Sequence, residues 1–193
     1  MKKFIAIVLL VFLMSCKTKY ANPHIVIHSN YGDIEIELFA KQAPKTVAAF
    51  LAYVDSGFYD NSSFYRVLLT EGLTTDDNIG LIQGGIWQTD PKHLVKIPGI
   101  VHESTKQTGL SHTDGTISLA RSTPGSANTE FFICIGDQTQ LDYGNTMQGG
   151  DGQGFAAFGR VVKGMSIVRK IQEQPSNGES FTGKILIYSI EKL

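Results

Sequence analysis

An arginine stands in the middle of an apolar segment, "SSFYRVLL", at residues 62–69. The segment has the composition of a β-strand, in which successive side chains point to opposite faces. Alternation predicts that Arg66 shares a face with Phe64 and Leu68. Tyr65 is then expected on the other face. An isolated strand arginine is more often part of an ion pair than a catalyst, but a guanidinium beside apolar groups indicates a binding groove.

Two further segments place polar or aromatic side chains where a groove could use them. Gln83 lies in "LIQGG", and Phe132 lies in "EFFICIG". Taken alone, Gln83 is explained by hydrogen bonds to neighbouring backbone groups and Phe132 by ordinary core packing. Cys134, in the same apolar stretch as Phe132, is expected to be a small core side chain rather than a reactive thiol. These residues therefore gain a functional meaning only in combination.

Several other classes of site are not supported by the sequence. The five histidines show neither an HExxH motif nor comparable ligand spacing, so no metal and no other cofactor is expected. The glycine-rich stretch "GGDGQG" at 149–154 lacks the G-x-G-x-x-G spacing of a phosphate loop and indicates an ordinary loop. A net charge of −1 and the absence of a basic run argue against a nucleic-acid partner.

The elements that would position these residues are mostly strands. Strands are predicted over eight segments: residues 24–29, 33–38, 64–69, 81–84, 116–121, 130–135, 156–162 and 184–190. A helix is predicted from Pro44 to a stop at Gly57, because apolar residues recur there with helical spacing, and another over residues 164–172. Eight strands and two helices in 193 residues favour one domain built as a closed barrel or a sandwich.

The N-terminus has the organisation of an export signal. Two lysines precede an uninterrupted apolar run of 11 residues, Phe4 to Met14, which is too short to span a bilayer but typical of a signal peptide. The following "LMSC" resembles a bacterial lipobox, so residues 1–15 are expected to be removed and Cys16 to carry the lipid. Residues 16–23 then form the lipidated cysteine and a short tether, in which residues 17–23 span roughly 25 Å when fully extended. Ordinary secretion is the alternative.

Four segments, in this order and spacing, resemble the cyclophilin family of peptidyl-prolyl isomerases. They are "FYRVL", "LIQGG", "GTISLARSTPGSANTEFFICIGD" and "FGRVVKGMSIVRKI", and the likeness covers residues 24–193. The resemblance implies a mostly β fold, a closed eight-stranded antiparallel barrel capped by two α-helices, with a peptide groove on its outer wall. It also implies an enzyme that isomerises X-Pro bonds without a cofactor.

The resemblance also implies roles for individual residues. Arg66 matches the family's catalytic arginine, and Gln83 matches a glutamine that helps to hold substrate and arginine. The other matched positions bind substrate: the pocket floor and walls (Leu81, Phe132, Leu141, Phe155), the backbone that holds the extended peptide (Ala120, Arg121) and the residue before the two phenylalanines (Glu130).

This chain departs from the family pattern at positions that border the groove. Glu130 replaces a glutamine, Gln140 replaces an aromatic residue, and Phe155 takes the place of a histidine or tyrosine. By strand alternation Glu130 is expected to share the groove face with Phe132, within reach of Arg66 or Arg121. A carboxylate there would change which peptides the groove prefers, because it accepts hydrogen bonds and does not donate them.

The sequence thus predicts a lipid-anchored isomerase outside the cytoplasm of a bacterium, facing the periplasm. We expect it to be a monomer that acts on proline-containing, unfolded or extended polypeptides during the folding of exported proteins. One alternative is a peptide-binding chaperone or assembly factor with little turnover. Another is a barrel that carries a lipid or glycan, which would leave Arg66, Gln83 and Phe132 unexplained.

Overall fold

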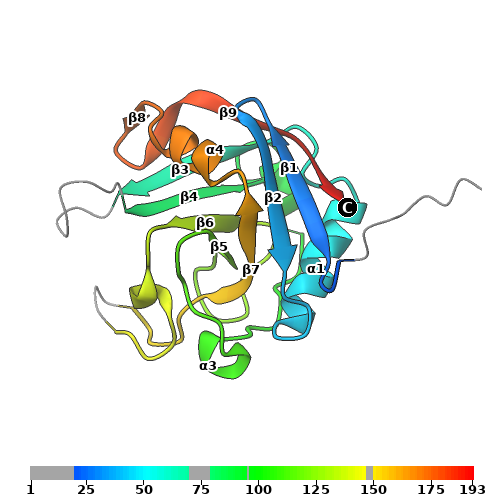
Figure 1. Ribbon diagram of the computed structural model, residues 1–193, viewed down its shortest axis with the longest axis vertical. Coiled ribbons are helices and arrows are strands. Elements are labelled where there is room, and N and C mark those ends of the chain that lie inside the picture. The colour runs from blue at the N-terminus through cyan, green and yellow to red at the C-terminus, as the bar shows by residue number, and fades with distance from the viewer. Residues whose placement is uncertain (1–19, 70–78, 95, 147–149) are drawn as a thin grey trace, which may run out of the picture.

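The computed structural model describes residues 20–69, 79–94, 96–146 and 150–193, and its secondary structure is mainly antiparallel β-sheet (Figure 1). The strands are β1 (His24–Ser29), β2 (Gly32–Leu38), β3 (Ser62–Leu69), β4 (Gly80–Gly85), β5 (Thr116–Leu119), β6 (Phe131–Ile135), β7 (Ala156–Lys163), β8 (Ser176–Asn177) and β9 (Ser180–Lys192). The helices are α1 (Pro44–Asp55), α2 (Pro91–Leu94), α3 (Thr105–Thr108), α4 (Met165–Gln172) and a single 3₁₀ turn, η1 (Thr139–Leu141).

The strands close into a barrel. In the described part of the chain, eight of them follow one another in the order β1-β2-β7-β5-β6-β4-β3-β9, and β9 pairs with β1 to complete the circle. Every pairing is antiparallel. The short strand β8 lies outside the circle as a hairpin with β9. Closure leaves no long unpaired edge, which is how such sheets avoid further strand pairing.

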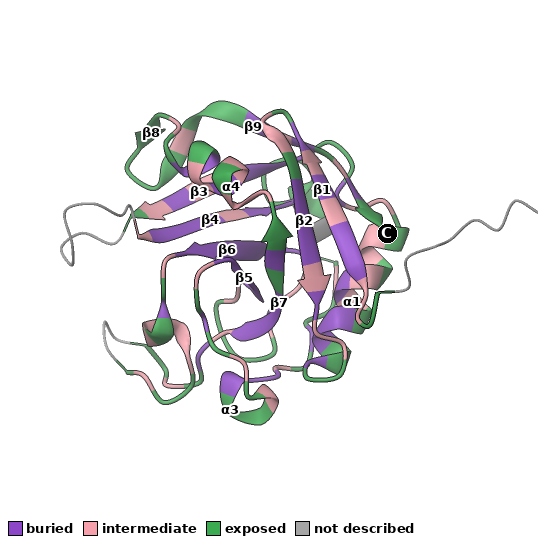
Figure 2. Cartoon of the chain, in the orientation of Figure 1, coloured by how far each residue is buried: buried purple, intermediate pink, exposed green. Residues whose placement is uncertain are grey.

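The barrel interior is filled by apolar side chains, and Figure 2 shows the central strands as largely buried. Each strand sends alternate residues inward, as Ile25 and Ile27 of β1 and Ile34 and Ile36 of β2 illustrate with no exposed surface. Phe131, also without exposed surface, makes edge-on contacts with Phe50, Tyr59 and Phe64 at centroid distances of 5.7 to 5.8 Å.

The two longer helices cover different strands of the barrel. Helix α1 lies against β7 and β9 and buries Thr46, Val47 and Phe50, whereas α4 lies against β2, β4 and β6 and buries Val168 and Ile171. Both were predicted from the sequence, α1 from its apolar spacing. The predicted closed eight-stranded antiparallel barrel is confirmed. The four-residue helices α2 and α3 were not predicted, because one turn is too short to show a helical period.

No helix in the described residues is both long and apolar enough to cross a bilayer. Residues 1–19, which include the predicted signal peptide and Cys16, lie outside the part of the chain that the structure describes.

Helix α1 begins without a capping side chain of its own. Its N-cap residue is Ala43, so the first backbone N–H groups have no local acceptor. A distant residue takes that role: the Glu103 carboxylate accepts hydrogen bonds from the backbone N–H of Lys45 at 3.2 Å and of Thr46 at 2.8 Å, and from the Thr46 hydroxyl at 2.8 Å. Glu103 is buried, so this negative charge lies at the positive end of the helix, where it stabilises the helix most.

We therefore expect Glu103→Ala to lower the free energy of unfolding by about 2 kcal/mol, because three donors, two of them buried, lose their acceptor. Glu103→Gln keeps one accepting oxygen, so its free energy of unfolding should fall by roughly half as much. Urea unfolding of the three proteins measures the effect. Equal midpoints for the native protein and Glu103→Ala would contradict a capping role.

Candidate active site

A groove of about 550 Å³ opens on the outer wall of the barrel beside β3, β4 and β6. All nine residues that the sequence proposed for a catalytic or substrate-binding role line it: Arg66, Leu81, Gln83, Ala120, Arg121, Glu130, Phe132, Leu141 and Phe155. Five lining residues were not proposed: Tyr65, Trp87, Ser122, Ser126 and Asn128. Trp87, which is 55% exposed, follows the "QGG" segment closely, and that proximity was the available signal.

The expected alternation along β3 is wrong at one point. Phe64 points into the barrel core, whereas Tyr65 and Arg66 both line the groove. The cause is a β-bulge: opposite β4, Phe64 pairs with Gly84 and Arg66 pairs with Gln83, so Tyr65 is an extra residue. The pairing with β9 is irregular at the same point, since Phe64 pairs with Ile185 and Arg66 pairs with Ser180. A bulge re-aims side chains in this way, and it brings a tyrosine into the site beside the arginine.

Glu130 contacts neither groove arginine, contrary to expectation. One carboxylate oxygen accepts hydrogen bonds from the backbone N–H groups of Ile86 at 2.8 Å and Trp87 at 3.2 Å, and from the Thr129 hydroxyl at 3.1 Å. The other oxygen accepts from the Tyr65 hydroxyl at 2.6 Å. Gly85, at φ 146°, has no side chain and so leaves room for the carboxylate.

These contacts fix the direction of a hydrogen-bond chain that ends at Arg66. Because ionised Glu130 can only accept, the Tyr65 hydroxyl must donate to it and can accept from the Gln83 amide nitrogen at 2.7 Å. The Gln83 carbonyl oxygen then faces Arg66 and accepts from Nη1 at 3.0 Å. Arg66 can only donate and ionised Glu130 can only accept, so both ends of the hydrogen-bond chain require the same orientation of the Gln83 amide.

Burial raises the pKa values of both Glu130 and Tyr65. Removal from water raises the pKa of Glu130 above its ordinary value of 4.5, and hydrogen bonds from Tyr65, Ile86 and Thr129 oppose that rise only in part. The pKa of Tyr65 is raised too, first by burial and then by the negative charge of Glu130. Tyr65 therefore stays protonated at neutral pH, as the direction of the chain requires.

On its other side Arg66 meets an acid from the β8–β9 hairpin. Glu179 accepts from Nε at 2.8 Å and lies 2.6 Å from Nη2. The guanidinium is thus held by Gln83 on one edge and by Glu179 on another, while the Arg66 side chain remains 40% exposed to the groove. Its position is fixed without being sealed from a ligand.

The groove floor is a small apolar cluster separate from the barrel core. Leu81, Phe132 and Cys134 are buried there, and burial raises the pKa of the Cys134 thiol, as expected for a core side chain. Leu141 and Phe155 pack against them, with the Phe132 and Phe155 rings perpendicular at 5.4 Å. An apolar recess next to fixed donors can take a compact ring and hold it while polar groups contact the adjoining backbone.

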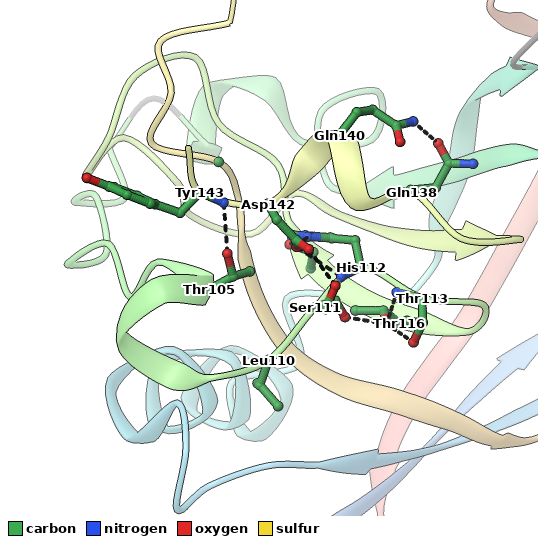
Figure 3. A network of polar contacts seen from close by, with 12 residues as sticks. Thr105, Leu110, Ser111, His112, Thr113, Thr116, Gln138, Gln140, Asp142 and Tyr143 are labelled. Carbon is green, nitrogen blue, oxygen red and sulfur yellow. Dashed lines mark hydrogen bonds and ion pairs between the residues drawn. The ribbon is translucent and has the colours of Figure 1, made fainter. Parts of the chain in front are cut away.

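A buried histidine supports Phe132 from behind, within the network shown in Figure 3. The His112 ring lies nearly parallel to Phe132, at 5.9 Å and 17°. Its Nδ1 contacts Asp142 at 2.6 Å, and its Nε2 contacts the Ser118 hydroxyl at 3.0 Å. Burial favours protonation of Asp142, but hydrogen bonds from His112 and Ser111 outweigh it and lower the pKa of this carboxyl. The charged network therefore fixes the ring under the floor.

Arg121 has a different environment from Arg66. Its side chain is 6% exposed and donates to both carboxylate oxygens of Asp151 at 2.8 Å and to the Gly154 carbonyl, with its guanidinium 5.0 Å from the centre of the Phe155 ring. Hydrogen bonding to Arg121 lowers the pKa of Asp151 to about 2. The guanidinium of Arg121 thus holds the loop that carries Phe155.

In the residues that the structure describes, no group of three or more His, Cys, Asp or Glu side chains is arranged to hold a metal ion. The arrangement offers hydrogen-bond donors, an apolar recess and a half-exposed guanidinium, which together can bind an extended peptide and favour one shape of its backbone.

Known proteins are similar to this chain over most of its length. The family model for "Cyclophilin type peptidyl-prolyl cis-trans isomerase/CLD" matches residues 24–192. A peptidyl-prolyl cis-trans isomerase of Acinetobacter baylyi is 36% identical over 178 residues, which are 92% of this chain and 86% of that protein. Peptidyl-prolyl cis-trans isomerase B of Escherichia coli is 37% identical over 150 residues, 77% of this chain and 83% of that protein.

Solved structures agree with these relatives. A cyclophilin type peptidyl-prolyl cis-trans isomerase of Cryptosporidium parvum has a TM-score of 0.68 at 25% identity, over 89% of this chain and 97% of that chain. The same protein in the presence of the dipeptide Ala-Pro has a TM-score of 0.66, over 87% of this chain and 97% of that one. With its sequence and its closed barrel both matched over most of their length, this chain belongs to the cyclophilin-type peptidyl-prolyl cis-trans isomerases.

Proposed function

We propose that this chain isomerises X-Pro bonds in extended segments of exported proteins, close to a bacterial membrane to which it is anchored by its N-terminal lipid. The observation that carries the catalytic part is the groove itself, in which a half-exposed guanidinium faces an apolar recess and is held from two sides. The related Cryptosporidium parvum structure, solved in the presence of the dipeptide Ala-Pro, supports a proline peptide as the ligand.

The reaction explains why these residue types suffice. Rotation about an amide is slow because the nitrogen lone pair is delocalised into the carbonyl, which gives a barrier of about 18 to 20 kcal/mol. No bond has to break. Arg66 donates to the prolyl nitrogen as its lone pair localises, which stabilises the twisted state more than either planar state. The recess formed by Leu81, Phe132, Leu141 and Phe155 holds the proline ring while the preceding residue rotates.

The roles of the remaining groove residues follow from their contacts. Gln83 holds Arg66 and is in turn held by Tyr65. The backbone of Ala120 and Arg121 runs along the groove and binds the extended peptide. Glu130 acts through Tyr65 and Gln83 on the arginine rather than on the substrate.

The location rests on the sequence of the first residues. A signal-like apolar run ends at "LMSC", and acylation of Cys16 would place the domain at the membrane surface on a tether of a few residues. We propose the periplasm, where newly exported chains are still extended, as the compartment in which the isomerase works as a monomer.

The central test is turnover. Exchange between cis and trans in a neutral proline peptide, followed by NMR with the full chain in detergent, should be accelerated by the native protein. Arg66→Ala should lower kcat/KM at least tenfold with an unchanged melting temperature, because its donor acts mainly in the twisted state.

Arg160→Ala, which removes an exposed arginine of β7, serves as the matched control and should retain full activity. Unchanged turnover in a folded Arg66→Ala protein would remove Arg66 from the mechanism. Peptide binding by a native protein without any turnover would favour the chaperone alternative.

A second prediction concerns the direction of the hydrogen-bond chain. In Glu130→Gln the amide oxygen must face the Ile86 and Trp87 N–H groups, so the amide nitrogen meets Tyr65. Tyr65 must then donate to Gln83, whose amide turns its nitrogen toward Arg66. We expect about a tenfold loss of kcat/KM, and the same loss in Tyr65→Phe and in the double variant, because all three break one chain.

Acid should have the same effect on the native protein. When Glu130 is protonated, its O–H donates to Tyr65 and reverses the direction of the hydrogen-bond chain. Burial raises the pKa of this carboxyl above its ordinary value of 4.5. We expect kcat/KM to fall on acidification with a midpoint above that value, and this step to be absent from Glu130→Gln. Additive losses in the double variant, or identical pH profiles for the two proteins, would show that Glu130 has no part in positioning Arg66.

A third prediction tests the anchor. Cys16→Ser should move the protein from the membrane fraction to the soluble fraction of its native host, because a short polar tether offers no other attachment. The substitution lies outside the barrel, so turnover in solution should be unchanged. Continued membrane association after the change would point to an uncleaved helix or to a binding partner.

A further inference from the structure

We propose that Glu179 is a specificity-determining residue that makes the isomerase prefer peptides with a basic residue next to proline. The inference rests on the proposed function and adds to it a substrate class. Glu179 comes from the tip of the β8–β9 hairpin, far along the chain from the motifs that form the groove, and its carboxylate lies against Arg66.

The position of Glu179 is fixed by the backbone as well as by the ion pair. The hairpin turns through Gly178, at φ 58°, and Glu179, between the paired residues Asn177 and Ser180. The Glu179 carbonyl oxygen accepts a hydrogen bond from the backbone N–H of Val67 at 2.8 Å. Since β3 also pairs Arg66 with Ser180, the tip is joined to the strand at the arginine itself and at the residue that follows it. The carboxylate therefore stays beside the groove.

One oxygen of this carboxylate remains available. Oε2 makes both contacts with Arg66, to Nε and Nη2, and Oε1 makes no hydrogen bond or ion pair among the described residues. The Glu179 side chain is 56% exposed. A lysine or arginine of a bound peptide could reach Oε1 without breaking the contact with Arg66, whereas a peptide carboxylate would meet a like charge.

The other charges of the groove reinforce this preference. Asp151 balances Arg121 and uses both oxygens to do so, and Glu179 balances Arg66. Glu130 is buried and has its full set of donors. Each groove arginine thus has its own acid, so neither offers an unmatched positive charge to an acidic peptide, and Glu179 is the acid with a free, exposed oxygen.

The test uses the full chain in detergent and a set of proline peptides that differ only in Lys, Gln or Glu at the positions flanking proline. Both kcat/KM and the dissociation constant are measured by NMR. The native protein should prefer the Lys to the Glu peptide by about two- to fivefold at one flanking position or more, the size expected for an exposed ion pair. Added salt should weaken the preference, because exposed charges are screened.

Glu179→Gln should abolish this preference and Glu179→Lys should reverse it. Glu191→Gln, which makes the same charge change at the opposite end of β9, should leave it intact. If Glu179 has only a structural role, its substitution should lower kcat/KM for all peptides alike and leave the Lys-to-Glu ratio unchanged. The ratio therefore separates a structural role from a role in specificity.

The outcomes distinguish this inference from the proposed function. A binding preference that depends on Glu179 in a protein without turnover would support the inference and overturn the proposed catalysis. Turnover without any preference, or with a preference that persists in Glu179→Gln, would overturn the inference alone. Absence of both turnover and preference would overturn both.

Discussion

The candidate active site depends on one buried carboxylate that, when ionised, can only accept hydrogen bonds. Four donors converge on Glu130, and the two backbone N–H groups among them would lose their partner if they faced a donating group, because they cannot accept. Because the carboxylate only accepts, the Tyr65 hydroxyl donates to it. This direction orients the Gln83 amide, which in turn holds one edge of the Arg66 guanidinium. The cost of burying the charge, seen in the raised pKa of Glu130, is offset in part by these hydrogen bonds. The result is a guanidinium that is held in one orientation before any substrate arrives.

A local irregularity in the barrel makes this chain of hydrogen bonds possible. In a regular β3, Tyr65 and Arg66 would point to opposite faces, so the groove could contain only one of them and Tyr65 could not link Gln83 and Arg66 to Glu130. The bulge puts two successive side chains on the outer face, and Gly85 leaves space for the carboxylate on the neighbouring strand. The closed circle of strands holds both features in register. Thus the irregular residues serve the site, and the regular ones maintain its geometry.

Sequence patterns predicted most of the fold, and the resemblance to the cyclophilin family predicted most of the groove residues. The strands and the first long helix follow from alternation and apolar spacing, whereas the expected roles of residues such as Arg66 and Phe132 came from the family's motifs. Tyr65 was missed because a bulge leaves no mark in the alternation pattern. The partners of Glu130, and the contacts made by Glu103 and Glu179, join segments that are distant in the chain, so only the folded barrel brings them together.

The two groove arginines show how burial decides what a residue can do. Arg121 has almost no exposed surface, and its donors are taken by Asp151 and Gly154, so its charge holds a loop in place. Arg66 is held as firmly on two edges yet keeps much of its surface in the groove. Rotation about an amide transfers no group and needs only a fixed donor that meets the twisted nitrogen better than the planar one. Firm support combined with exposure is therefore the property that distinguishes Arg66, and its neighbours supply both.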